Sequence, residues 1–137
     1  MKTYLLLALA AVIITVESCK KDKESPCENT KCAPPARKVH FELYTNENFA
    51  GEKKNITFRI FMRNHTRTIL DSSLATMKVE EIPDFNHRII IEKFVPRNDT
   101  STLVVGFIYY LENVGESWYL EDFPSGNNFK VLTYPFR

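Results

Sequence analysis

The sequence predicts an all-β domain over residues 39–137, an antiparallel β-sandwich of immunoglobulin-like architecture with about seven or eight strands. Short apolar runs with strand-like alternation recur along this region, and Gly, Pro, Asn and Asp separate them. Ten Phe and six Tyr against four Gly in the whole chain are typical of a well-filled β-core. No segment after residue 18 has helical periodicity. A small antiparallel barrel is the alternative architecture.

The first half of this region has the clearest alternation. Val39, Phe41 and Leu43 alternate with polar residues, which predicts a half-buried strand. A second strand over residues 56–63 should place its alternate apolar residues in the core, namely Ile56, Phe58, Ile60 and Met62. A polar turn at 64–65 then leads into a third strand over 66–72, and a short strand follows over 77–81.

The second half contains the most apolar strands. Three consecutive isoleucines in the strand 88–95 predict either a strand covered on both faces or a bulge. The run 103–111 should be a central strand, and Gly106 within it marks a bend or a close backbone approach. Segments 118–122 and 129–136 should complete the sheets, since Pro135 is acceptable near the end of an edge strand.

The N-terminus has the layout of a secretory signal. Lys2 precedes an apolar run over 4–16, which at about 13 residues is shorter than the roughly 20 needed to span a membrane. Cys19 stands where the signal ends, in the stretch Val-Glu-Ser-Cys-Lys-Lys-Asp over 16–22. This stretch resembles the lipobox of bacterial lipoproteins, and most of all that of small lipoproteins of the Bacteroidota.

The resemblance implies that residues 1–18 are a lipoprotein signal peptide and that Cys19 becomes the lipidated N-terminus. It therefore implies a lipid-anchored protein of the cell envelope, with the membrane leaflet left open. Two alternatives are an ordinary signal peptide cut after Ser18 and an uncleaved anchor.

Residues 19–38 predict a lipidated, disordered tether. The segment is charged, and Pro26, Pro34 and Pro35 block a regular helix or central strand. Because every strand signal lies after residue 38, residues 39–137 should fold without the tether. Cys27 and Cys32 are candidates for a disulfide in an oxidising compartment. Free thiols and a metal pair are the alternatives, and a metal would need two further ligands.

Composition and motifs argue against two classes of function. Eighteen Lys and Arg nearly balance seventeen Asp and Glu, whereas a nucleic-acid partner favours an excess of positive charge. No nucleophile, metal or phosphate-binding motif occurs, and His40, His65 and His87 are far apart in the sequence. The carboxylate pairs at 80–81 and 121–122 are adjacent on strands and should face opposite ways. We therefore predict no catalytic residue, no metal and no cofactor.

Two groups of residues are candidates for binding. Arg59, Phe61 and Arg63 share the outer face of one predicted strand within the basic stretch 53–67. They suggest a patch for an anionic glycan or lipid headgroup, or charges that protect a sheet edge and pair with acidic residues of 112–122. Trp118 and Tyr119 are candidates to stack on a sugar ring, although a lone Trp in a small sandwich favours a core position.

The sequence thus suggests a lipid-anchored, non-catalytic accessory of the envelope, with a protein or glycan partner. One alternative is an enzyme with an unrecognised site. Another is a secreted, glycosylated binding protein of a eukaryote, which the sequons at Asn55, Asn64 and Asn98 would support.

Overall fold

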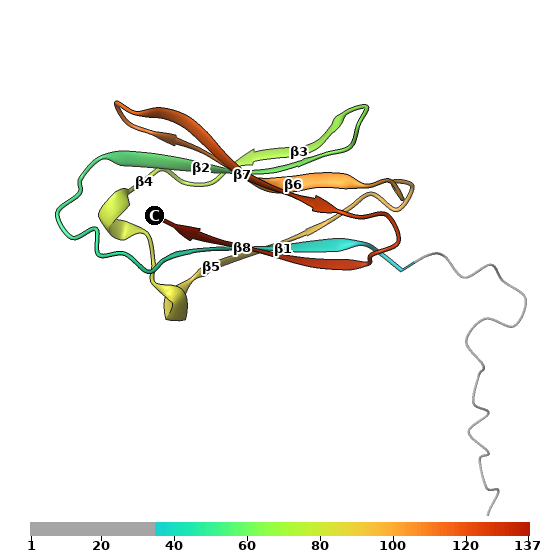
Figure 1. Ribbon diagram of the computed structural model, residues 1–137, viewed down its shortest axis with the longest axis horizontal. Coiled ribbons are helices and arrows are strands. Elements are labelled where there is room, and N and C mark those ends of the chain that lie inside the picture. The colour runs from blue at the N-terminus through green and yellow to red at the C-terminus, as the bar shows by residue number, and fades with distance from the viewer. Residues whose placement is uncertain (1–34) are drawn as a thin grey trace, which may run out of the picture. The chain divides into compact units, whose positions relative to one another are not determined.

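A computed structural model describes residues 35–137 of the chain (Figure 1). The expected signal peptide and the three cysteines, Cys19, Cys27 and Cys32, lie outside the described residues. Residues 35–137 form eight strands and two short 3-10 helices: β1 Lys38–Thr45, β2 Asn55–Arg63, β3 Thr68–Ser73, β4 Met77–Lys78, η1 Val79–Glu81, η2 Phe85–His87, β5 Ile89–Phe94, β6 Leu103–Leu111, β7 Gly115–Phe123 and β8 Phe129–Phe136. Neither helix is long or apolar enough to cross a membrane.

The strands form two sheets that pack face to face (Figure 1). Sheet A has the order β5-β1-β8, and sheet B has the order β3-β2-β6-β7, with β4 also paired to β2. The predicted β-sandwich is confirmed, and the alternative of a closed barrel is wrong for residues 35–137. One strand pair departs from the antiparallel arrangement, since β1 and β8 run parallel.

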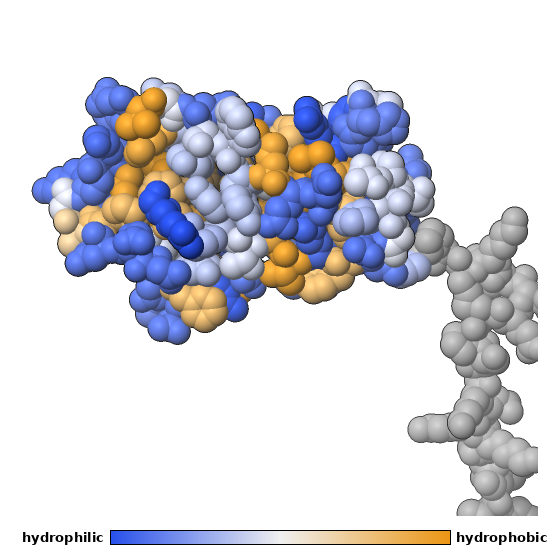
Figure 2. All heavy atoms as spheres, viewed as in Figure 1, coloured by the Kyte–Doolittle hydropathy of each residue, from blue (hydrophilic) through white to orange (hydrophobic). Residues whose placement is uncertain are grey.

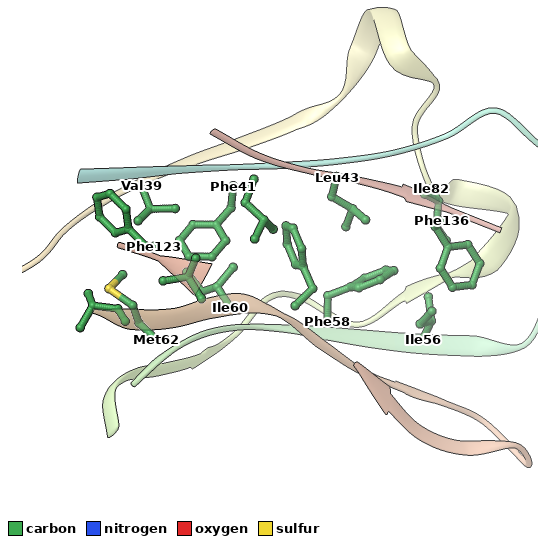
Figure 3. Close-up of a cluster of buried hydrophobic side chains, with 14 of the residues drawn as sticks. Val39, Phe41, Leu43, Ile56, Phe58, Ile60, Met62, Ile82, Phe123 and Phe136 are labelled. Carbon is green, nitrogen blue, oxygen red and sulfur yellow. The ribbon is translucent and has the colours of Figure 1, made fainter. Parts of the chain in front are cut away.

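The core lies between the two sheets and follows from the period-2 alternation of the strands. Figure 3 shows side chains of β1 and β2 pointing toward one another across it. The residues predicted to face inward are all buried: Val39, Phe41, Leu43, Ile56, Phe58, Ile60 and Met62. Phe41 and Phe107 meet edge to face, with ring centroids 5.6 Å apart. Each such burial contributes about 1.5–3 kcal/mol, so these strands hold the sandwich together.

The three isoleucines of β5 do not form a strand covered on both faces. Ile90 is 52% exposed on the outer side of sheet A, and Ile89 and Ile91 are half-buried on the inner side. The register with β1 runs without a shift from Lys38–Phe94 to Leu43–Ile89, so there is no bulge between these pairs. Both parts of the prediction were wrong, because nothing within residues 35–137 covers the outer face of sheet A, and the antiparallel register of β5 with β1 is regular.

The domain begins before the predicted boundary at residue 39. β1 starts at Lys38, and Arg37 is only 7% exposed. The Arg37 side chain donates five hydrogen bonds of 2.7–3.2 Å to backbone carbonyls, those of Asp99, Ser101, Phe123, Pro124 and Asn127. Its guanidinium carbon also lies 4.3 Å from the ring centroid of Phe123. Burial lowers the pKa of Arg37, and the nearby Asp99 opposes that shift. Arg37 therefore belongs to the folded domain and not to the tether.

The edges of the two sheets meet at β7 and β8 through a small polar and aromatic cluster. Tyr119 of β7 stacks on Tyr134 of β8, with ring centroids 4.9 Å apart. The Tyr119 hydroxyl donates to Glu121, and Lys130 Nζ donates to the same carboxylate, each at 2.6 Å. These contacts link β7 of sheet B to β8 of sheet A.

This cluster predicts a loss of stability in alkali. Burial raises the pKa of Tyr134, and the hydrogen bond to Glu121 raises that of Tyr119. Both groups would lose their protons first in the unfolded chain, near pH 10. The free energy of unfolding should therefore hold below about pH 10 and fall above it, by at most ~1.4 kcal/mol per pH unit for each tyrosine. Thermal melts between pH 8 and 11 measure this.

The Tyr134→Phe variant provides the control, since it keeps the ring but cannot ionise there. Its melting temperature should fall less steeply with pH than that of the wild type. Equal slopes would show that Tyr134 does not contribute to the alkaline loss.

Candidate functional site

The register of sheet B places alternate residues of three strands on one side, away from the core. We call this the outer face of sheet B and define it by its paired residues: Thr57, Arg59, Phe61 and Arg63 of β2, Val104, Gly106, Ile108 and Tyr110 of β6, and Glu116, Trp118, Leu120 and Asp122 of β7. Directly paired residues of antiparallel strands share a face. The sheet therefore assembles a continuous surface from segments up to about sixty residues apart in the chain.

Two large aromatic side chains are exposed on this face, beside the exposed charged residues Arg63, Glu116 and Asp122. Trp118 is 66% exposed and Tyr110 is 55% exposed. Trp118 pairs with Ile108 and Tyr110 pairs with Glu116, so the two aromatic residues are diagonal neighbours on β6 and β7. Phe61 of β2 lies further along the face, paired with Gly106, and is half-buried.

An ion-pair network lies next to the aromatic residues. Arg59 Nε donates to Asp71 of β3 at 2.9 Å, and its Nη2 donates to the second carboxylate oxygen of Asp71. Arg59 Nη1 donates to Glu116 at 3.4 Å. The hydrogen bond to Asp71 raises the pKa of Arg59. The guanidinium is thus held in place from two sides before any ligand arrives.

This network bears on the two interpretations of the basic stretch at one residue, Arg59. The sequence left open a patch for anionic ligands or charges that pair within the fold. Arg59 pairs within the fold, with Asp71 and Glu116. The four charged residues of the outer face carry equal numbers of positive and negative charges, as Arg59 and Arg63 against Glu116 and Asp122.

Trp118 and Tyr119 occupy different sides of sheet B. The favoured core position for Trp118 is wrong, since its side chain is exposed. Tyr119 does not belong to the outer face, because it pairs with the buried Phe107 and packs against Tyr134. Adjacent residues of a strand point to opposite sides, so the two never share a surface.

The structure therefore joins four of the five predicted binding residues on one face: Arg59, Phe61, Arg63 and Trp118. Sequence analysis missed Tyr110 and Asp71 as members of this site, whereas Glu116 lies in the acidic stretch 112–122 that was considered as a partner of the basic residues. Tyr110 has a sequence signal, because it alternates with the inward residues of 103–111. Asp71 has none, since only the pairing of β2 with β3 brings it near Arg59.

The other candidate residues stay apart from this face. His40 pairs with Glu92 on sheet A, and His87 pairs with Asp84 in η2. Among residues 35–137, no group of three His, Cys, Asp or Glu side chains is placed to hold a metal. A surface depression of about 500 Å³ lies elsewhere, between residues 45–50 and the 3-10 helices, and its lining is mainly polar.

The outer face of sheet A also carries exposed apolar side chains, and Figure 2 shows hydrophobic patches on both layers. On sheet A these side chains are Ile90, Phe94, Phe129 and Val131. Two polar neighbours cover part of them: Lys38 Nζ lies 5.4 Å above the ring of Phe129, and His40 packs edge-on against that ring at 4.8 Å. The twelve residues that define the outer face of sheet B include no lysine.

No protein-family model matches this chain, and comparisons with curated proteins and with solved structures give no match.

Proposed function

We propose that this chain is a lipid-anchored lipoprotein of the bacterial cell envelope whose β-sandwich binds a partner through the outer face of sheet B. The anchor rests on the sequence alone, on the signal layout that ends at Cys19. The binding role rests on one structural observation: exposed Trp118 and Tyr110 surround an ordered Arg59 network. Trp, Tyr and Arg are the residue types that dominate binding energy at interfaces.

The position of this face suits an anchored binding module. The chain joins the domain at Arg37 and Lys38, at the start of a strand in sheet A. The outer face of sheet B lies on the far side of the other layer. In Figure 1 the β2–β3 and β6–β7 hairpins at the two ends of sheet B bend away from sheet A. The point of attachment and the proposed binding surface are thus separated by the core.

The titratable groups of the described domain favour binding over catalysis. A general acid needs a carboxyl pKa raised toward neutrality. The pKa values of Asp84 and Glu92 are lowered instead, that of Asp84 by hydrogen bonds with His87 and that of Glu92 by hydrogen bonds from Lys38 and His40. Both carboxylates are exposed and paired, which is the behaviour of surface ion pairs.

Lipidation is tested on the purified full-length protein from its own membrane. Mass spectrometry of the N-terminal peptide should find Cys19 as the first residue, carrying a diacylglycerol thioether. Several acyl chains hold a protein on a membrane stably, at about 0.8 kcal/mol per buried CH₂. An unmodified Cys19, or a mature chain that starts elsewhere, would contradict the anchor.

The binding face is tested by photo-crosslinking in intact cells. A benzophenone amino acid at position 118 should crosslink the protein to an envelope component upon irradiation. The same group at Phe94 is the matched control, because Phe94 is an aromatic residue 61% exposed on sheet A. Crosslinks of equal yield at both positions, or none at position 118, would rule out the outer face of sheet B as the binding surface.

A further inference from the structure

The Arg59 network restricts what the outer face of sheet B is able to bind. Arginine recognises a carboxylate or phosphate through two parallel N–H groups on one edge of its guanidinium. In Arg59 the edge formed by Nε and Nη2 is occupied by Asp71, and Nη1 points to Glu116. An anionic ligand would have to displace a carboxylate that the fold already supplies. Arg59 is therefore unsuited to anionic lipids or acidic polysaccharides.

The charge of the face leads to the same conclusion. Its paired residues contain two arginines and two acidic residues, and Asp71 adds a further negative charge beside Arg59. A surface that attracts polyanions or polycations needs a field of one sign. This face carries charges of both signs, and Arg59 is held by Asp71 and Glu116, so the face has no field of one sign and its ligand should be uncharged.

The polar groups of this face that have unused hydrogen-bonding sites are suited to the hydroxyl groups of a ligand. A carboxylate has about four lone-pair sites, and Arg59 uses only part of those on Glu116. In the same row, Thr57 bonds to Thr76 through their hydroxyls at 2.7 Å, and Tyr110 adds a phenolic hydroxyl. Hydroxyl groups both donate and accept, so they bond to such a row without needing a net charge.

An apolar row lies directly beside this polar row. Trp118 pairs with Ile108, which in turn pairs with Arg59, so a flat exposed ring sits next to fixed charged groups. A sugar ring has the complementary chemistry, with C–H groups on its face and hydroxyls around its rim. Its face would pack on Trp118 and its rim would reach Glu116 and Tyr110, the nearest polar neighbours in the register.

We infer that the outer face of sheet B binds a neutral glycan, with Trp118 as the stacking platform and Glu116 as a hydroxyl acceptor. This inference rests on the proposed function, since it names the ligand class of the same face. A protein partner would also use Trp and Tyr, but a hot-spot arginine usually pairs across the interface. Arg59 is already paired within the domain, which favours the glycan.

Trp118 allows a direct test, because it is the only tryptophan in the chain. The full-length protein in detergent is titrated with neutral polysaccharides of defined composition: dextran, a β-1,4-glucan oligomer, xylan and galactomannan. Polygalacturonate and anionic phospholipid vesicles serve as charged probes. At least one neutral glycan should shift the Trp118 emission to shorter wavelength, saturably, and raising the salt concentration should not weaken binding.

Substitutions test whether glycan binding occurs at the outer face of sheet B. Trp118→Ala should weaken glycan affinity about tenfold, as measured by affinity electrophoresis, and Glu116→Gln should weaken it several-fold. Both residues are exposed, so the melting temperatures should stay close to that of the wild type. Phe94→Ala on sheet A is the matched control and should leave affinity unchanged.

The outcomes separate this inference from the proposed function. If no neutral glycan in the panel changes the Trp118 emission, or if only the charged probes do, the glycan inference is wrong. Crosslinking of position 118 to a protein would then still support a binding face with a protein partner. If there is neither glycan binding nor a crosslink at position 118, both the glycan inference and the proposed binding function are wrong.

Discussion

Replacing Arg37 by methionine should lower the free energy of unfolding by about 3 kcal/mol or more. Two of its hydrogen bonds, to the carbonyls of Asp99 and Phe123, are fully buried. A hydrogen bond from a charged group is worth about 1.5–3 kcal/mol, and methionine would leave these carbonyls without a donor. Chemical denaturation of the wild type and Arg37→Met measures the difference.

Arg97→Met is the control for this substitution, because Arg97 is an exposed arginine in a loop of the same domain. Exposed substitutions of this kind usually change stability by less than about 0.5 kcal/mol. If both variants lost the same free energy of unfolding, the hydrogen bonds of Arg37 would contribute no more to stability than an exposed arginine does.

The same arginine revises the expectation for truncation. A fragment that begins at Val39 lacks Arg37, so it should melt well below a fragment that begins at Pro35. The sequence predicted that residues 39–137 would fold as stably as the longer chain. Equal melting temperatures of the two fragments would restore that prediction.

Replacing Gly106 by alanine should cost about 3 kcal/mol or more, at the upper end of the range for overpacked sites. A Cβ atom on Gly106 would lie 2.0 Å from the backbone oxygen of Tyr119 and 2.7 Å from a side-chain carbon of Leu120. The first of these atoms belongs to the paired strand β7 and cannot move without breaking the register. The predicted close backbone approach at Gly106 is therefore confirmed.

Gly51→Ala separates this clash from backbone strain. Gly51 has a φ of 89°, but a Cβ there would meet no atom within 4 Å. Its substitution should cost about 1 kcal/mol, the penalty of the left-handed conformation alone. Leu120→Ala in the Gly106→Ala background should restore little stability, because the contact with Tyr119 remains. Full recovery in that double variant would show that only the Leu120 side chain opposes a Cβ.

The sequence alone determined β1 and β2 and their inward faces. Strict alternation in β1 and β2 leaves one arrangement that buries Val39, Phe41 and Leu43 against Ile56 and Phe58. A shift by one residue would expose all of them, so local pattern and global fold agree.

The sequence did not determine which residues each element meets. Adjacent residues 118 and 119 had to face opposite ways, but only the pairing of β7 with β6 turns Trp118 outward and Tyr119 inward. The exposure of Ile90 depends likewise on tertiary structure, since the pairing of β5 with β1 places it on the outer face of sheet A.

Arg37 shows the physical reason for this division. In the sequence it follows prolines and precedes a lysine, and nothing marks it as buried. Its hydrogen-bond acceptors are carbonyls of residues 99–127, which lie far away along the chain. Periodicity reports what a residue does within its own strand, whereas burial of a charge depends on partners that only the tertiary structure brings together.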